Sequence, residues 1–432
     1  MWAYWKWRVA IGAGVVVALV GIGVAAYFLV DALKEEPAQE APAPAPAPRI
    51  VIHEKRPQPQ AAQELGFPEF ATKNTTRVSG ADPVADAAAV ALAVFPSTGG
   101  VAGPDAVSLV DESDWKSGIA AASLAGPPVS APILISSRDG VPALTTDALK
   151  ALGPSGSAAT QSAQLFEIGN TETPSGLDRE QVSGKTPAEI AAEVDALRQK
   201  LTGTKPKDVL LVSTAQPRYA MPAASWAARS GEPVLFVGKD SVPKPTLDAL
   251  KRDEDADVFA LGPSSVISDK ALEEVEKVAK APVRIGDSDP VQNAIDFARF
   301  SAGTFGWNIT DPGHGLVIAS DTEPLDAAAA APLSASGNWG PLLVTDDPDQ
   351  VPDALRGYLL DIKPGYVTDP TRAVYNHAWI IGDQSRVSVG FQAQVDDLAE
   401  VAPVRSGTGT NVKPPPSGPS KKKQQNKGNG KK

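Results

Sequence analysis

Few residues in this chain combine the type and the spacing that catalysis or metal binding requires. The sequence has no cysteine and three histidines, His53, His314 and His377. No two of these histidines stand at a metal-ligand spacing, and without cysteine there is no thiolate ligand or thiol nucleophile. A Gly-x-Ser-x-Gly nucleophile motif is also absent from the sequence. The sequence therefore predicts no catalytic residue and no metal site, and we expect a protein that is not an enzyme.

The motifs that bind nucleotides are incomplete. Gly184-Lys185-Thr186 resembles the end of a phosphate-binding loop, but Arg179 occupies the position of the first glycine of that motif. No Gly-x-Gly-x-x-Gly segment follows a predicted strand, as a dinucleotide site would require. We therefore expect no cofactor.

Cations follow two proline-initiated apolar runs at the same distance. Arg138 is the sixth residue after Pro132, and Lys239 is the sixth after Pro233, whereas Asp347 has this position in a third such run. An arginine fork or a lysine ammonium at the edge of a sheet could bind the phosphate or carboxylate groups of an anionic polymer. The alternative is that both are ordinary solvated loop charges.

Polar residues also end three apolar runs, at Asp111, Ser213 and Ser320. Functional groups of α/β proteins often lie at this edge of a sheet. The alternative interpretation, which we prefer, is that these side chains cap the helices that follow.

An internal repeat positions these residues. Two markers recur at a spacing of about a hundred residues, which suits a small domain repeated in tandem. They are an opening glycine at Gly80, Gly184 and Gly286, and a proline before an apolar run at Pro132, Pro233 and Pro341.

Within each repeat, short apolar runs alternate with helical patterns. In the second repeat, 209–213, 233–237 and 258–262 have the composition of buried strands, and predicted helices separate them. Continuous apolar strands separated by helices indicate a parallel sheet covered on both faces. The sequence therefore predicts the α/β class, with three tandem flavodoxin-like or Rossmann-like modules over residues 76–178, 179–281 and 282–404.

The segment before the repeats predicts a membrane anchor. Residues 9–30 carry no charge and lie between Arg8 and Asp31. As a helix this run would be about 33 Å long, at roughly 1.5 Å per residue, which is enough to span a bilayer. Lys6 and Arg8 precede it and favour a cytoplasmic amino terminus. A cleaved signal peptide is the alternative, but the run is long for one. We expect residues 1–31 to form a cytoplasmic stub and a single transmembrane helix.

Two low-complexity segments flank the modules. Residues 32–75 include an alternating Pro/Ala stretch, which is typical of a semi-rigid linker. Residues 405–432 are rich in lysine and nearly free of apolar side chains, so we expect a disordered tail. Its lysines, among them Lys421, Lys422 and Lys423, either tether the chain to anionic polymer or lipid, or form a solvated end.

The distribution of charge along the chain indicates which class of partner it favours. The chain has a net charge of −11 although both ends are basic, so the repeats themselves are strongly acidic. An acidic surface does not favour nucleic acid, because counterion release needs basic side chains.

The repeats resemble the cell wall-binding repeat 2 family over about Thr76 to Val404. The family's opening turn is similar to Arg77-Val78-Ser79-Gly80 and Arg284-Ile285-Gly286, and its Pro-Ile-Leu-Leu strand is similar to the runs that begin at Pro132, Pro233 and Pro341. The Asp-Arg-Tyr-x-Thr-Ala segment that follows the opening glycine in the family is absent here.

The resemblance implies three modules packed with pseudo-threefold symmetry and non-covalent retention on the cell wall through an anionic polymer, with no catalysis. The polymer-binding candidates are Arg138, Lys239, Arg77, Arg284, Lys421, Lys422 and Lys423. The modules would then lie outside the cell in the wall zone, held by one membrane helix. Two alternatives stay open: a surface scaffold that binds an unidentified protein, and a solute-binding or hydrolytic α/β protein that shares the repeat.

Overall fold

The computed structural model describes residues 70–96, 102–286, 289–335 and 339–404. The predicted membrane helix, most of the linker and the lysine-rich tail lie outside these residues. Within the described ranges, no helix is both long enough and apolar enough to cross a membrane.

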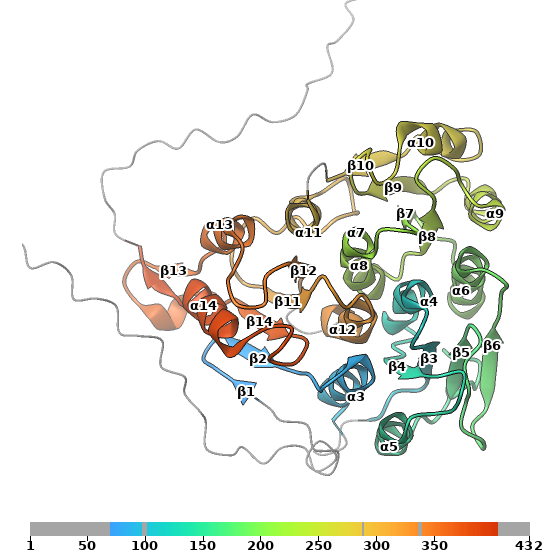
Figure 1. Cartoon of the computed structure of the whole chain (residues 1–432), viewed down its shortest axis with the longest axis horizontal. Helices are drawn as coiled ribbons and strands as arrows, with labels where there is room; N and C mark the ends of the chain where they lie inside the picture. The colour runs from blue at the N-terminus through green and yellow to red at the C-terminus, as the bar shows by residue number, and fades with distance from the viewer. Residues whose placement is uncertain (1–69, 97–101, 287–288, 336–338, 405–432) are drawn as a thin grey trace, which may run out of the picture. The chain divides into compact units, whose positions relative to one another are not determined.

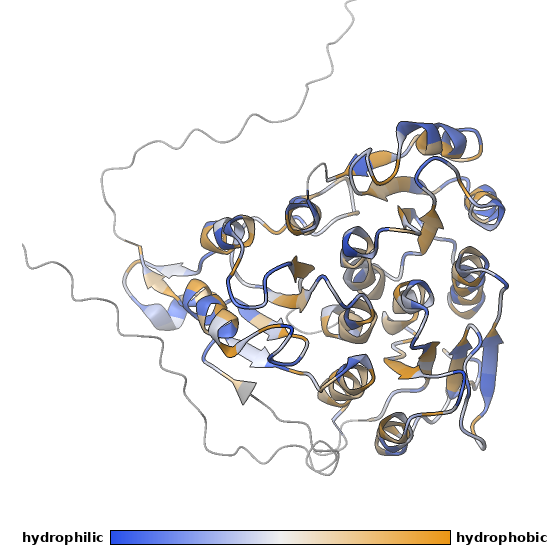
Figure 2. Cartoon of the chain, viewed as in Figure 1, coloured by the Kyte–Doolittle hydropathy of each residue, from blue (hydrophilic) through white to orange (hydrophobic). Residues whose placement is uncertain are grey.

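The first sheet has four parallel strands in the order β4-β3-β5-β6. Its strands are β3 (Val107–Asp111), β4 (Ile133–Ser136), β5 (Leu165–Ile168) and β6 (Arg179–Val182). The apolar strands β3, β4 and β5 are buried along their whole length, whereas the polar edge strand β6 is largely exposed and hydrophilic in Figure 2.

The second sheet repeats this arrangement, with all strands parallel in the order β10-β9-β7-β8. Its strands are β7 (Asp208–Ser213), β8 (Val234–Val237), β9 (Asp257–Leu261) and β10 (Val283–Ile285). The predicted α/β class with parallel sheets is thus confirmed for these two sheets.

The third sheet contains β11 (Gly315–Ser320), β12 (Leu342–Thr345) and β14 (His377–Ile380). It also takes in β2 (Thr75–Arg77) and β1 (Phe70–Ala71), from the start of the described chain, in the order β1-β2-β14-β11-β12. β1 pairs antiparallel with β2, so this sheet is not wholly parallel. The sequence predicts a linker as far as residue 75, but Phe70, Ala71 and Thr75 are part of this sheet.

Each strand that opens a repeat joins the sheet of another repeat. β6 pairs with β5, and β10 pairs with β9, so both extend the preceding sheet. β2 has no preceding repeat and pairs in parallel with β14, with Arg77 opposite Ile380. Figure 1 shows the blue strand β2 beside the orange-red strand β14. The first strand of the repeats therefore completes the last sheet, and the three repeats form a closed cycle.

The opening helices start in the same way in all three repeats, with proline in the first turn and a side chain that accepts a hydrogen bond from a free backbone N–H. They are α3 (Pro83–Val94) capped by Asp82, α6 (Pro187–Thr202) capped by Thr186, and α11 (Pro290–Arg299) capped by Asp289.

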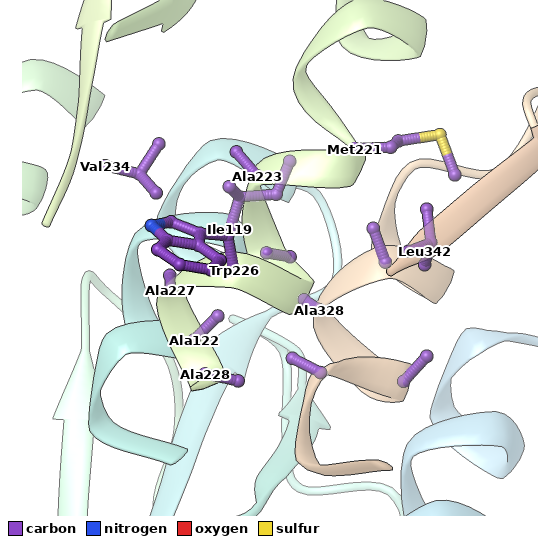
Figure 3. Close-up of a cluster of buried hydrophobic side chains, with 14 of the residues drawn as sticks. Ile119, Ala122, Met221, Ala223, Trp226, Ala227, Ala228, Val234, Ala328 and Leu342 are labelled. Carbon is purple, nitrogen blue, oxygen red and sulfur yellow. The ribbon is translucent and has the colours of Figure 1, made fainter. Parts of the chain in front are cut away.

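Alanine-rich helices from the three repeats pack against one another between the sheets (Figures 1 and 3). They are α4 (Trp115–Ala121) with η1 (Ala122–Ala125), α8 (Pro222–Ser230) and α12 (Leu325–Ala335). Every residue of α12 is buried. A Cβ placed on Gly118 of α4 would lie 3.0 Å from the Cβ of Ala328, so the small side chains allow the helices to approach closely.

The remaining elements complete the described chain. They are α5 (Ala143–Leu152), α7 (Pro217–Ala220), α9 (Lys244–Arg252), α10 (Asp269–Glu276), α13 (Asp353–Asp361), β13 (Gly365–Tyr366), η2 (Pro370–Arg372), α14 (Val389–Ala399) and β15 (Ala402–Pro403).

Candidate functional site

Arg138 and Lys239 lie in equivalent loops, each two residues beyond the carboxyl end of its strand, β4 and β8. Lys239 is exposed, and within the described ranges no carboxylate pairs with its ammonium group. Its backbone oxygen accepts a hydrogen bond from Ser268, which fixes the loop and leaves the side chain available to a ligand.

Arg138 is less available to a ligand than Lys239, because its guanidinium pairs with the buried carboxylate of Asp111 at the end of β3. Burial opposes ionisation of Asp111, but hydrogen bonds from Ser113 and the charge of Arg138 outweigh it and hold the pKa of this carboxyl below its usual value. The Arg138 side chain is 59% exposed, so it can still meet an anion from solvent.

Asp347 occupies the equivalent loop of the third repeat. Its carboxylate accepts hydrogen bonds from the backbone N–H groups of Asp349 (2.8 Å) and Gln350 (2.9 Å), which lower its pKa. The equivalent position is therefore a cation in two repeats, followed in each by an aspartate, and an acid in the third, as the sequence predicts.

Arg77 is buried and makes its hydrogen bonds inside the protein. Its guanidinium donates to the backbone oxygens of Gly382 and Val387 and to the side-chain oxygen of Gln392, the last two at 2.6 and 3.2 Å. Burial lowers the pKa of Arg77 to about 10. These contacts join β2 to the loop after β14 and to α14, so they hold the closing strand in place. A contact between Arg77 and a polymer stays a prediction.

Arg284 on β10 is the counterpart of Arg77, with fewer contacts. It donates to the backbone oxygen of Gly262 at 2.9 Å and pairs with the exposed carboxylate of Asp269 at 2.8 Å. Its side chain is 22% exposed, so it is closer to solvent than Arg77. The three tail lysines lie outside the described residues.

The polar residues at the strand ends hold turns. Ser213 accepts a hydrogen bond from the N–H of Ala215 at 3.1 Å, and Ser320 contacts the hydroxyl of Thr322 at 2.9 Å. Asp111 likewise accepts from Ser113. These bonds stabilise the turn before each helix. The prediction that Asp111 and Ser213 cap the following helices is wrong, because Asp114 caps α4 and α7 has no side-chain cap.

One charged cluster was not predicted. The Arg386 guanidinium, in the loop after β14, donates to Asp86 of α3 and to Asp326 of α12, both at 2.7 Å. Both carboxyl groups are fully buried. Burial raises the pKa of each, and the charge of Asp86 raises that of Asp326 further. The cluster joins the first and third repeats, and no local sequence pattern links residues so far apart.

A cavity lies at the opposite edge of the sheets. Its volume is about 520 Å³, and it lies between the starts of β7 and β8 and the segment 304–307 of the third repeat. Within the described ranges, no group of three histidine, aspartate or glutamate side chains has a geometry suited to a metal ion.

Comparison with known proteins supports the fold. No family model matches the chain, and no curated protein matches it. Among solved structures, Cwp6 from Clostridium difficile aligns with a TM-score of 0.59 and 19% identity over 76% of this chain and 49% of that protein. Cwp8 from the same organism aligns with a TM-score of 0.57 and 19% identity over 75% of this chain and 52% of that protein. The chain spans about half the length of each, and at this identity the similarity shows a shared fold.

Proposed function

We propose that this chain is a non-catalytic surface protein that contacts the bacterial cell wall. The observation that carries the proposal is the shared fold with Cwp6 and Cwp8 over three quarters of the chain, because both are cell wall proteins. The apolar run at residues 9–30 would anchor the chain in the membrane, and the modules would lie in the wall zone.

The binding surface we assign is the edge of the sheets at the carboxyl ends of β4 and β8, where Arg138 and Lys239 lie. An anionic wall polymer is the ligand class that suits two exposed cations on equivalent loops. Lys239 would contribute more than Arg138, because Arg138 must share its charge with Asp111. Contacts between exposed charges are screened by salt, so retention on the wall should weaken as salt increases.

The test is a pull-down of the full chain on purified cell wall across a salt series. The variant Lys239→Gln with Arg138→Gln should bind more weakly. Lys205→Gln is the matched control, since Lys205 is an exposed lysine at the opposite edge of the second sheet, before β7. A third variant replaces Lys421, Lys422 and Lys423 with glutamine.

The outcomes separate the candidate surfaces. Weaker retention of the loop variant, with the control unchanged, supports binding by the modules. Weaker retention of the tail variant alone would contradict it and leave the modules as a spacer or a protein-binding scaffold.

A further inference from the structure

The cavity between the second and third repeats has a lining unlike the rest of the protein. Its lining residues are Lys207, Asp208, Trp226, Arg229, Ser230, Glu232, Thr304, Gly306, Trp307 and Trp339. Three of the protein's eight tryptophans meet here, from α8, from the segment after α11 and from the residues before β12. A volume of about 520 Å³ lies within the range of about 300–1,000 Å³ typical of small-molecule sites.

The tryptophan side chains form one connected group. Trp226 and Trp307 pack edge to face with ring centroids 5.3 Å apart, and Trp307 and Trp339 are 6.0 Å apart. Trp226 is 7% exposed and Trp307 is 4% exposed. Figure 3 shows the ring nitrogen of Trp226 on the side away from Ala328 and Leu342.

Two hydrogen-bond donors in this group have no partner. The ring nitrogens Nε1 of Trp226 and Trp307 are buried, and neither donates to any of the described residues. A buried indole N–H normally finds an acceptor, because leaving it unpaired forfeits the hydrogen bond it made to water. A ligand oxygen in the cavity would supply the missing acceptor.

The polar groups around the tryptophans include both donors and acceptors. The Arg229 guanidinium lies over the ring of Trp339 at 4.1 Å from its centroid, and within the described part of the chain no carboxylate pairs with it. Glu232 accepts only long hydrogen bonds, of 3.4 Å, from the N–H groups of Lys207 and Asp208. The lining of the cavity therefore holds both a donor and a weakly bound acceptor.

We propose that this cavity binds a neutral pyranose unit of a saccharide. Sugar hydroxyls donate and accept hydrogen bonds, so they match a lining that offers both. The apolar face of a pyranose ring packs on an indole, and Trp339 is the partly exposed tryptophan of the group, with the Arg229 guanidinium over one of its two faces. Lys207 and Arg229 balance the carboxyl groups of Asp208 and Glu232 in the lining, so the cavity has no excess of positive charge that would favour an anionic sugar.

The cavity is separate from the loops that carry Arg138 and Lys239. Glu232 precedes β8 and Lys239 follows it, so the two sites are about 20 Å apart along the strand, at roughly 3.3 Å per residue. Sugar binding here does not depend on whether the loops bind an anionic polymer.

Saturation-transfer NMR on the full chain, in a detergent without a sugar headgroup, tests the proposal. The probes are cellotriose, maltotriose and di-N-acetylchitobiose, with glucuronic acid as the anionic comparison. At least one neutral probe should bind. Trp307→Phe keeps the ring and loses the N–H, so it should weaken binding by about 3- to 10-fold.

Two further variants separate loss of the site from loss of the fold. Thr304→Trp adds bulk at an exposed lining residue and should abolish binding without removing a core contact. Trp379→Phe on β14, where Trp379 packs on His377, is the matched control and should bind as the natural chain does. The proposal is overturned if no neutral probe binds, if glucuronic acid binds best, or if Thr304→Trp binds unchanged.

Discussion

Replacing Arg77 by methionine should destabilise the protein through the strand that closes the cycle of repeats. The substitution keeps most of the aliphatic stem but removes the guanidinium. Two backbone oxygens, of Gly382 and Val387, and the side-chain oxygen of Gln392 would each lose a donor. At roughly 1–2 kcal/mol for each bond lost in a buried site, the free energy of unfolding should fall by about 3–5 kcal/mol.

Arg284→Met is the matched control for this prediction. Arg284 occupies the equivalent strand, β10, but makes a single bond to a backbone oxygen, and its acidic partner Asp269 is largely exposed. Its loss should cost about 1–1.5 kcal/mol. Urea unfolding followed by circular dichroism measures both values, and hydrogen exchange should show reduced protection at β2 and β14 only in Arg77→Met. Equal destabilisation by the two substitutions would refute the assignment of Arg77 as the residue that holds the closing strand.

Three other perturbations test the packing and the buried charges. Gly118→Leu should lower the free energy of unfolding by about 1–3 kcal/mol in urea, because its Cβ alone would lie 3.0 Å from the Cβ of Ala328; no loss would contradict the close helix packing. Arg386→Met leaves two buried carboxyl groups without their cation and should cost about 3–5 kcal/mol, and adding Asp326→Asn should recover part of this; a cost that the second change increases would argue against the cluster. Burial raises the pKa of Glu232 and of Asp253 to about 7, above the value of about 4 for unfolded carboxyls, so the folded state binds more protons between about pH 4 and 7. Their contribution to stability is therefore lost as pH rises through this window. In a plot of melting temperature against pH, Glu232→Gln with Asp253→Asn should reduce the slope over this window. An unchanged slope would contradict the prediction.

The sequence predicted the strands well because their apolar runs have few alternatives. Ile133–Ser136 and Val234–Val237 are buried along their whole length, as continuous apolar runs after proline require. The repeat spacing then indicated that equivalent elements recur, and the structure has them in the expected order.

The closure of the cycle could not be predicted from local patterns. β2 pairs with a strand from the far end of the described chain, and a short polar strand such as Thr75–Arg77 gives no signal of its partner. The Arg386 cluster has the same origin, since it brings Asp86 of the first repeat against Asp326 and Arg386 of the third. Only the three-dimensional packing brings these residues together.

The Arg138 and Lys239 loops could be predicted from the sequence, whereas the cavity could not. Arg138 and Lys239 share a fixed distance from a repeated proline, so the repeat itself pointed to them. Trp226 lies in a helix of small residues and has the pattern of an ordinary core residue, which is why sequence reasoning passed over it. Trp307 and Trp339 come from separate loops, and their meeting with Trp226 depends on how the second and third repeats pack.

The most direct test of the proposed function is the affinity of the full chain for purified cell wall before and after its anionic polymers are removed. Binding to the intact wall that weakens with salt and disappears on the stripped wall is the expected result. Equal binding to the intact and the stripped wall would contradict recognition of an anionic polymer.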